Sequence, residues 1–128
     1  MPESEGVFIV DLHDYQHDRP LLAAAGTLLV EIGKDARARG YAEPLVWALG
    51  ALATVVQAVL RGNRSPQGLR FDLGGVAENQ LVDVLSLLDC ARETVDSFDS
   101  EAGAGLLFLL GAPFTVELGR RTSGEVLS

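Results

Sequence analysis

The sequence predicts a mainly α-helical fold, and three observations indicate it. Apolar residues recur at steps of three and four over 21–39 and again over 76–98, which is the spacing of amphipathic helices. Between them, 44–60 is apolar on nearly all sides and begins with a proline, as expected of a central, buried helix. Strand-like patterns are confined to short segments. We therefore expect a helical hairpin, a third long amphipathic helix and short terminal β segments. The alternative is an α+β fold with a small sheet from the N-terminal, 69–73 and C-terminal segments.

The length of the chain predicts one domain. With 128 residues it can bury a single core but not two well-packed ones. We therefore expect 1–128 to form a single domain whose ends, 1–6 and 120–128, are loose. Hydrophobic residues make up 48% of the chain, a high share for so small a domain, and this predicts apolar surface that a partner or a second copy covers.

The N-terminal part is expected to run from a short strand into the first helix. Residues 7–12, VFIVDL, are β-branched and apolar over the length of a strand. Asp18 can accept a hydrogen bond from the first turn of a helix, and Pro20 suits that turn because its missing N–H costs nothing there. Gly40 then closes the helix.

The first two helices carry three internal glycines, Gly26, Gly33 and Gly50. A glycine inside a helix costs about 1 kcal/mol relative to alanine, so the three together cost roughly 3 kcal/mol. We expect close helix packing to offset this cost. Gly26 and Gly33 are seven residues apart and lie on one side of their helix, where they form a notch for another backbone. The sequence therefore predicts a tightly crossed hairpin with Gly50 near the crossing.

The third helix, 76–98, combines an apolar stripe with an acidic face. The stripe consists of Leu81, Val84, Leu88, Ala91, Val95 and Phe98. The opposite side carries Asp83, Asp89, Glu93 and Asp96. Arg92 falls inside the apolar stripe, where it either extends past Leu88 and Val95 to solvent or pairs with a carboxylate across a helix interface.

The remaining segments are expected to be turns and short strands. Residues 62–68, GNRSPQG, are typical of a turn, and 69–75 of an extended segment. The run 106–110 is either a buried strand or a short helix, and periodicity does not separate the two. The sequence GAP at 111–113 predicts a break, and 114–118 alternates like a strand, so we favour a terminal β-hairpin.

Charge and cysteine content exclude several classes of partner and compartment. A net charge of −8 disfavours nucleic acids and anionic membranes, because both repel it. A single cysteine, Cys90, cannot form an internal disulfide, and the N-terminus has acids where a secretory signal needs basic residues. The longest uncharged stretch, 44–60, is at the lower limit of a membrane span, and polar residues dilute it. We expect a cytoplasmic protein without a membrane segment.

Both histidines, His13 and His17, stand among carboxylates in the sequence HDYQHD. In a helix, residues four apart share a face, and these imidazoles together with Asp14 have the ligand types that suit zinc or iron. That geometry requires a helix across 13–17, whereas Asp18 predicts a helix start just after it. We therefore favour a cap and linker, with a metal site as the alternative.

The favoured function is non-enzymatic. We find no phosphate-binding loop and no nucleophile motif, so we assign no catalytic residue and expect no cofactor. The chain is expected to be a protein–protein interaction module, either a homodimer or an adaptor subunit of a larger assembly. Its expected interface residues are Gly26, Gly33, Gly50, Leu88, Arg92 and Val95.

Two other functions remain as alternatives. An acidic inhibitor would imitate phosphates through the third helix, using Asp83, Asp89, Glu93 and Asp96. A small metal-dependent enzyme would use the region of His13 and His17. The identity of the partner and the oligomeric state stay open at this point.

Overall fold

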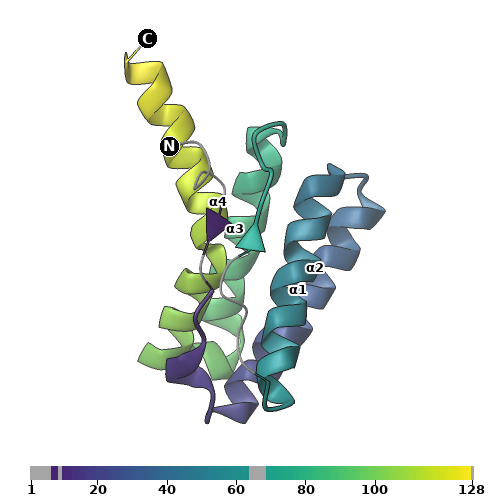
Figure 1. Cartoon of the computed structure of the whole chain (residues 1–128), viewed down its shortest axis with the longest axis vertical. Helices are drawn as coiled ribbons and strands as arrows, with labels where there is room; N and C mark the ends of the chain where they lie inside the picture. Colours follow the sequence, from purple (N-terminus) through teal and green to yellow (C-terminus); the bar gives the residue numbers. More distant parts are fainter. Residues whose placement is uncertain (1–6, 9, 64–68, 128) are drawn as a thin grey trace.

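Over the residues that the structure describes, the protein is a bundle of four α-helices (Figure 1), which confirms the prediction of a mainly α-helical fold. The computed structural model describes residues 7–8, 10–63 and 69–127. The helices are α1 (Arg19–Ala38), α2 (Glu43–Leu60), α3 (Glu78–Thr94) and α4 (Glu101–Leu127). Two short 3-10 helices, η2 (His13–Tyr15) and η3 (Asp96–Phe98), precede α1 and α4. Two strands of two residues, β1 (Val7–Phe8) and β2 (Leu69–Arg70), complete the fold.

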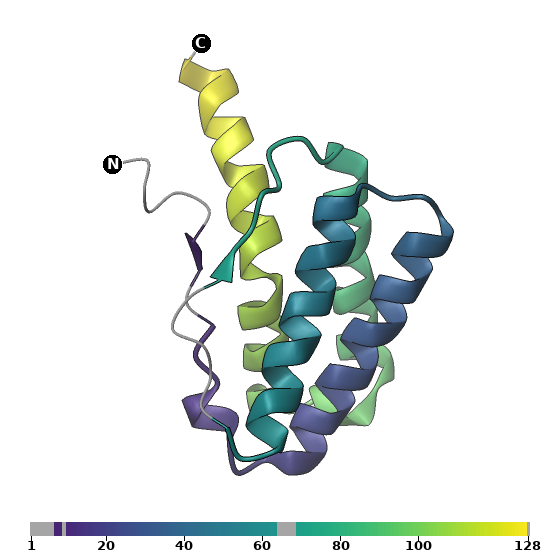
Figure 2. The same ribbon diagram turned by 45° about the vertical axis from the view of Figure 1, so that its right-hand side comes forward.

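Helices α1 and α2 form the first hairpin (Figure 2), and its ends follow the sequence signals. The side chain of Asp18 accepts a hydrogen bond from the backbone N–H of Leu21 at 3.3 Å, which is the predicted N-cap of α1. Gly40 has a φ of +75°, a left-handed conformation that glycine adopts without strain, and it ends α1 before the turn into α2. Gly62 closes α2 in the same way, with a φ of +88°.

Helices α3 and α4 form a second hairpin, and here the sequence prediction was wrong. The predicted terminal β-hairpin does not form, because α4 continues through 106–118 and on to Leu127, past the point from which we expected a loose end. Pro113 cannot donate the helical hydrogen bond to the preceding turn. However, Leu110 and Phe114 beside it are fully buried in the bundle. This packing outweighs the local signal, as tertiary context often does.

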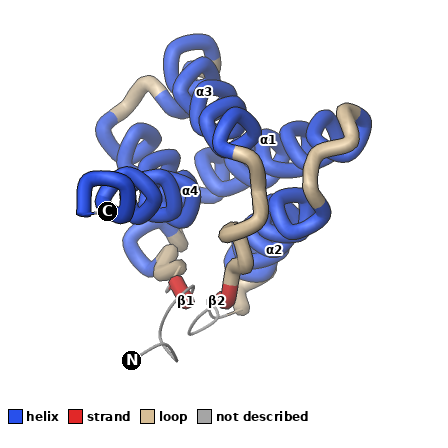
Figure 3. The backbone as a smooth tube through the Cα atoms, turned by 90° about the horizontal axis from the view of Figure 1, so that it is seen from above, coloured by secondary structure: helices blue, strands red, loops and turns tan. Residues whose placement is uncertain are grey.

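The two strands pair antiparallel beside the helices (Figure 3), with Val7 opposite Arg70 and Phe8 opposite Leu69. The predicted strand 7–12 is not present at 10–12, and the alternative sheet that includes the C-terminal segment is not formed, because that segment is helical. The expected loose residues 1–6 lie outside the described part of the chain, as does most of the predicted turn 62–68.

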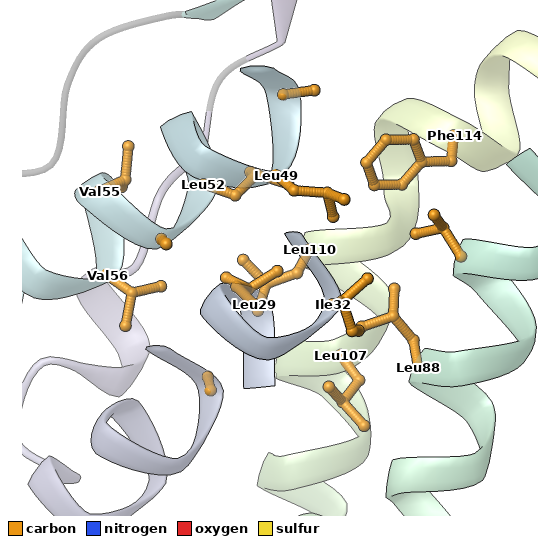
Figure 4. Close-up of a cluster of buried hydrophobic side chains, with 14 of the residues drawn as sticks. Leu29, Ile32, Leu49, Leu52, Val55, Val56, Leu88, Leu107, Leu110 and Phe114 are labelled. Atoms are coloured by element: carbon orange, nitrogen blue, oxygen red, sulfur yellow. The ribbon is translucent and has the colours of Figure 1, made fainter. Parts of the chain in front are cut away.

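All four helices contribute to one hydrophobic core (Figure 4). The labelled side chains that meet there include Leu29 and Ile32 of α1, Leu49 and Leu52 of α2, Leu88 of α3, and Leu107, Leu110 and Phe114 of α4. Within the third helix the predicted stripe is buried at Leu81, Val84, Leu88 and Ala91. The helix ends at Thr94 rather than 98, and Phe98 is buried from η3 instead.

A polar cluster joins the turn of the first hairpin to α3. The Tyr41 hydroxyl donates to Asp83 Oδ2 at 2.8 Å, and Arg39 contacts the same oxygen at 3.3 Å. The Gln80 side-chain oxygen accepts from the backbone N–H of Ala42 at 3.1 Å. Two contacts raise the pKa of the Arg39 guanidinium. The larger effect comes from its hydrogen bond with Tyr41, and the next from its attraction to Asp35.

A second polar cluster joins α4 to the segment that connects the hairpins. Arg121 donates hydrogen bonds to the backbone carbonyls of Leu73 at 2.8 Å and of Val76 at 2.7 Å. Glu117, only 8% exposed, holds the Arg121 guanidinium at 2.9 Å and also pairs with Arg120. The connecting segment is thus fixed by a side chain more than forty residues away in the sequence.

Candidate interaction surfaces

The structure does not assemble a metal site around the two histidines. His13 lies in η2 and His17 follows it, and both are exposed. Because α1 begins at Arg19, the two imidazoles do not share a helix face. Across the described residues, no three His, Cys, Asp or Glu side chains lie close enough together to hold a metal ion. The backbone N–H of His13 donates instead to Asp11 Oδ1 at 3.0 Å, which stabilises the entry to the first hairpin.

The four carboxylates of the predicted acidic face are not equivalent. Asp83 is occupied inside the molecule by Tyr41 and Arg39. Asp89 and Glu93 are exposed on α3, whereas Asp96 is exposed in η3, beyond the helix end. Only two of the four therefore project freely from the rigid helix on which a phosphate mimic would depend.

The predicted interface residues of α3 also separate by burial. Leu88 is 4% exposed and belongs to the core, while Val95 is 37% exposed at the helix end. Arg92 is exposed and has no carboxylate partner in the described part of the chain, so its guanidinium extends to solvent. It borders a small hollow of about 160 Å³ between α3 and α4, together with Phe108.

The glycines of the first hairpin only partly match the predicted notch. A Cβ atom at Gly26 would lie 3.5 Å from Val56 Cγ1, and one at Gly33 would lie 3.8 Å from Leu49 Cβ. Both glycines therefore face α2, but at ordinary van der Waals distances that alanine would also tolerate. A Cβ at Gly50 would meet nothing within 4 Å, so the placement of Gly50 at the crossing was wrong.

Gly50 instead lies in a hollow on the outer side of the first hairpin. This hollow has a volume of about 980 Å³. A second one of about 320 Å³ shares Arg37, Val46, Gly50 and Thr54 with it. Together they form what we call the α2 groove, lined by Val30, Gly33, Lys34, Arg37, Tyr41, Glu43, Val46, Trp47, Gly50, Ala51, Thr54, Gln57, Ala58 and Leu69, among others.

The α2 groove is lined by the only tryptophan of the chain. Trp47 is 56% exposed and contacts the buried ring of Phe71 edge-on, at a centroid distance of 6.1 Å. The expectation of a central, buried helix is thus met only on one side of α2, because its other face is open. The sequence pattern did not reveal this face, because apolar residues lie on both the open side and the core side of α2.

The second exposed apolar surface lies on α4. Phe108 is 77% exposed and Val116 is 53% exposed. No Asp, Glu, Lys or Arg occurs between Glu101 and Glu117, so the solvent-facing side of these turns carries no charge. We call this surface, with Phe108, Ala112, Thr115 and Val116, the outer face of α4. The sequence did not predict this surface. The pattern of 106–110 fits a strand as well as a helix, so it does not show which side chains face solvent.

Helices α2 and α4 also meet the length and hydropathy of a membrane span. The spans are Glu43–Leu60 and Glu101–Arg121, and in each the share of the window buried inside the bundle is 44%. Core helices of water-soluble proteins meet the same criterion, so this composition is weak support for a membrane location. Within the described residues, the exposed large apolar side chains are Trp47 of the α2 groove, Phe108 and Val116 of α4, Val82 of α3 and Val95 directly after α3.

No protein-family model, curated protein or solved structure matches this chain. Inferences about function therefore depend on the geometry and chemistry of the two surfaces.

Proposed function

We propose that the protein is a non-enzymatic protein–protein interaction module that forms a homodimer through the outer face of α4. The observation that carries this proposal is the exposure of Phe108, which is 77% accessible on an uncharged helix face. Full burial of a phenylalanine side chain contributes about 2 to 3 kcal/mol, and a symmetric contact would bury one from each copy. Aromatic side chains at the centre of an interface often supply much of its binding energy.

Charge favours a second copy at this particular face. Each copy carries a net charge of −8, so two copies repel each other at long range. The exposed side of α3 presents Asp89 and Glu93, and a symmetric contact there would place like charges together. The outer face of α4 has no charge between Glu101 and Glu117, and the hollow beside Phe108 is bordered by one residue of each sign, Asp89 and Arg92, so two copies can meet there with less repulsion than along α3.

The test is the molar mass in solution, measured by light scattering after size exclusion. We expect untagged wild-type protein to elute as a dimer and Phe108→Asp to elute as a monomer with an unchanged helical circular dichroism spectrum. Trp47→Asp is the matched control, because Trp47 is 56% exposed on α2, in the other hairpin. A wild-type protein that stays monomeric at high concentration would contradict the proposal, as would equal masses for the Phe108 and Trp47 variants.

A further inference from the structure

We propose that the α2 groove binds an amphipathic α-helix of a partner protein that carries acidic residues along one edge. This inference rests on the proposed role as an interaction module, but it concerns a different surface from the outer face of α4. Three properties of the groove support it, namely its length, its apolar floor and the charges on its border. The net charge of the whole molecule supports it as well.

The dimensions of the groove suit a helix. Its lining residues follow α2 from Glu43 to Ala58, and at 1.5 Å per residue this is about 22 Å, or roughly four helical turns. Gly50 lies midway along it, where a Cβ would meet nothing within 4 Å. The missing side chain gives a bound helix room to approach the α2 backbone closely.

The floor of the groove is apolar and partly open to water. Trp47 is more than half exposed, and Val46 and Ala51 are half-buried beside it. Leu69 from β2 lines the groove at the other side. A partner with apolar residues at steps of three and four would remove this surface from water, as in the known mode of helix-in-groove recognition.

The border of the groove on α1 is cationic. Lys34 and Arg37 both line it and both are exposed. Within the described ranges, neither forms an ion pair, whereas the neighbouring Asp35 is already paired with Arg39 at 3.1 Å. Two uncompensated cations along one edge attract carboxylates on the facing edge of a bound helix.

The opposite charge stands at one end only. Glu43 lines the groove in the first turn of α2. A helix bound along α2 is therefore expected to place its acidic residues opposite Lys34 and Arg37 and to keep them away from Glu43. The bound helix thus has a preferred edge, and this charge pattern distinguishes it from an uncharged apolar peptide.

An anionic membrane is the less favourable occupant of the same surface. Lys34 and Arg37 would attract lipid head groups, but a molecule of net charge −8 is repelled by an anionic bilayer as a whole. A concave surface also fits a single helix better than a flat bilayer. A helix of a partner protein is therefore the proposed occupant, and lipid vesicles test the membrane alternative.

The experiment uses the fluorescence of Trp47, the only tryptophan, as a reporter inside the groove. The probe is a designed amphipathic helix of about 16 residues without tryptophan, with leucines on one face and glutamates along one edge. Its counterpart has lysines in place of the glutamates. Arg37→Glu tests the charged border, and Arg92→Glu is the matched control, because Arg92 makes the same charge change on the other hairpin. Gly50→Leu fills the open space at Gly50 and tests whether a bound helix needs it.

We expect the glutamate probe to shift the Trp47 emission of the wild type to shorter wavelength, and the lysine probe to bind at least about tenfold more weakly. Arg37→Glu should raise the Kd for the glutamate probe about tenfold, while Arg92→Glu leaves it within about twofold. Gly50→Leu should abolish the shift while the protein remains folded by circular dichroism.

Equal binding of the two probes, or no Trp47 shift with either, would overturn the proposal. So would a Trp47 shift with phosphatidylglycerol vesicles that Arg37→Glu removes, because the occupant would then be a lipid surface. The Phe108→Asp variant separates this inference from the proposed function. If the wild type is a dimer that Phe108→Asp dissociates, but neither probe binds, then the groove inference fails and the interaction module stands.

Discussion

The two hairpins of this bundle use glycine in opposite ways. In the first hairpin, Cβ atoms at Gly26 and Gly33 would lie 3.5 and 3.8 Å from their nearest neighbours, which are ordinary contacts. In the second, a Cβ at Gly103 would lie 2.5 Å from the Phe98 Cα and 2.6 Å from the Ser97 carbonyl oxygen. A side chain does not fit there. A glycine in an apolar helix therefore indicates a close approach only where the partner backbone reaches it.

The two hairpins also differ in the surface they leave open. The first exposes a concave groove with cations on its border, and the second exposes an uncharged helix face with Phe108. The first therefore suits a partner of complementary charge, whereas the second suits a copy of itself. The variants below test this contrast, starting with the largest expected effect.

Gly103→Ala should damage the second hairpin most. The added methyl group would overlap with the backbone of η3, which cannot move without displacing the buried Phe98, so we expect a loss of about 3 kcal/mol in the free energy of unfolding. Denaturant titration followed by circular dichroism measures it. Gly105→Ala is the control: its Cβ would meet only the Tyr15 hydroxyl, at 2.9 Å, which is the movable end of a side chain. Equal losses for both variants would contradict a steric origin.

Arg121→Met should have the next largest effect, because it removes the attachment of the connecting segment to the second hairpin. The carbonyls of Leu73 and Val76 lose a charged donor, and the buried Glu117 loses one of its two partners. We expect a loss of about 2 kcal/mol. Arg120→Met is the control. Arg120 also pairs with Glu117 but does not bind those carbonyls, so the loss of unfolding free energy should be much smaller. Hydrogen exchange at 73–77 should accelerate in the Arg121 variant alone.

Gly50→Ala should have the smallest effect, and in the opposite direction. Since a Cβ there meets nothing within 4 Å, the higher helix propensity of alanine should raise the unfolding free energy by up to about 1 kcal/mol. Gly26→Ala should gain less, because its methyl group must fit beside Val56. A thermal melt compares the two variants. A destabilised Gly50→Ala would indicate that the first hairpin needs this glycine after all, and the contrast between the hairpins would be lost.

The first hairpin was largely predictable from sequence, since its signals are local. Asp18, Pro20 and Gly40 set the ends of α1 as expected, because caps act within a single turn. The second hairpin was only half predictable. The buried positions of α3 follow three-and-four spacing, but α4 contains Gly111 and Pro113, which locally favour a break. Its helical state depends on the burial of Leu110 and Phe114 against other helices, and a local pattern does not contain that information.

The open apolar surfaces were predicted less well than the fold. Gly33, Gly50 and Arg92 do border hollows, and Leu88 lines the hollow of Arg92 although it is itself buried, whereas Gly26 is buried and lines none of these hollows. Trp47 and Phe108 were missed. Both are apolar residues in apolar helices, so sequence alone assigns them to the core with the same pattern that assigns Leu49 or Leu110 there. Only the packing of the four helices determines which apolar side remains open.

The hydrogen bonds of Arg121 have a consequence for the order in which the chain folds during synthesis. The first hairpin depends on contacts between neighbours in sequence and can form as soon as α2 has left the ribosome. The segment between the hairpins has to wait, because the side chain that holds Leu73 in place is made 48 residues later. During this interval the half-finished chain exposes core side chains of the first hairpin, such as Ile32 and Leu49, that meet the second hairpin in the finished protein. We expect this intermediate, rather than the finished protein, to be the species most in need of a chaperone.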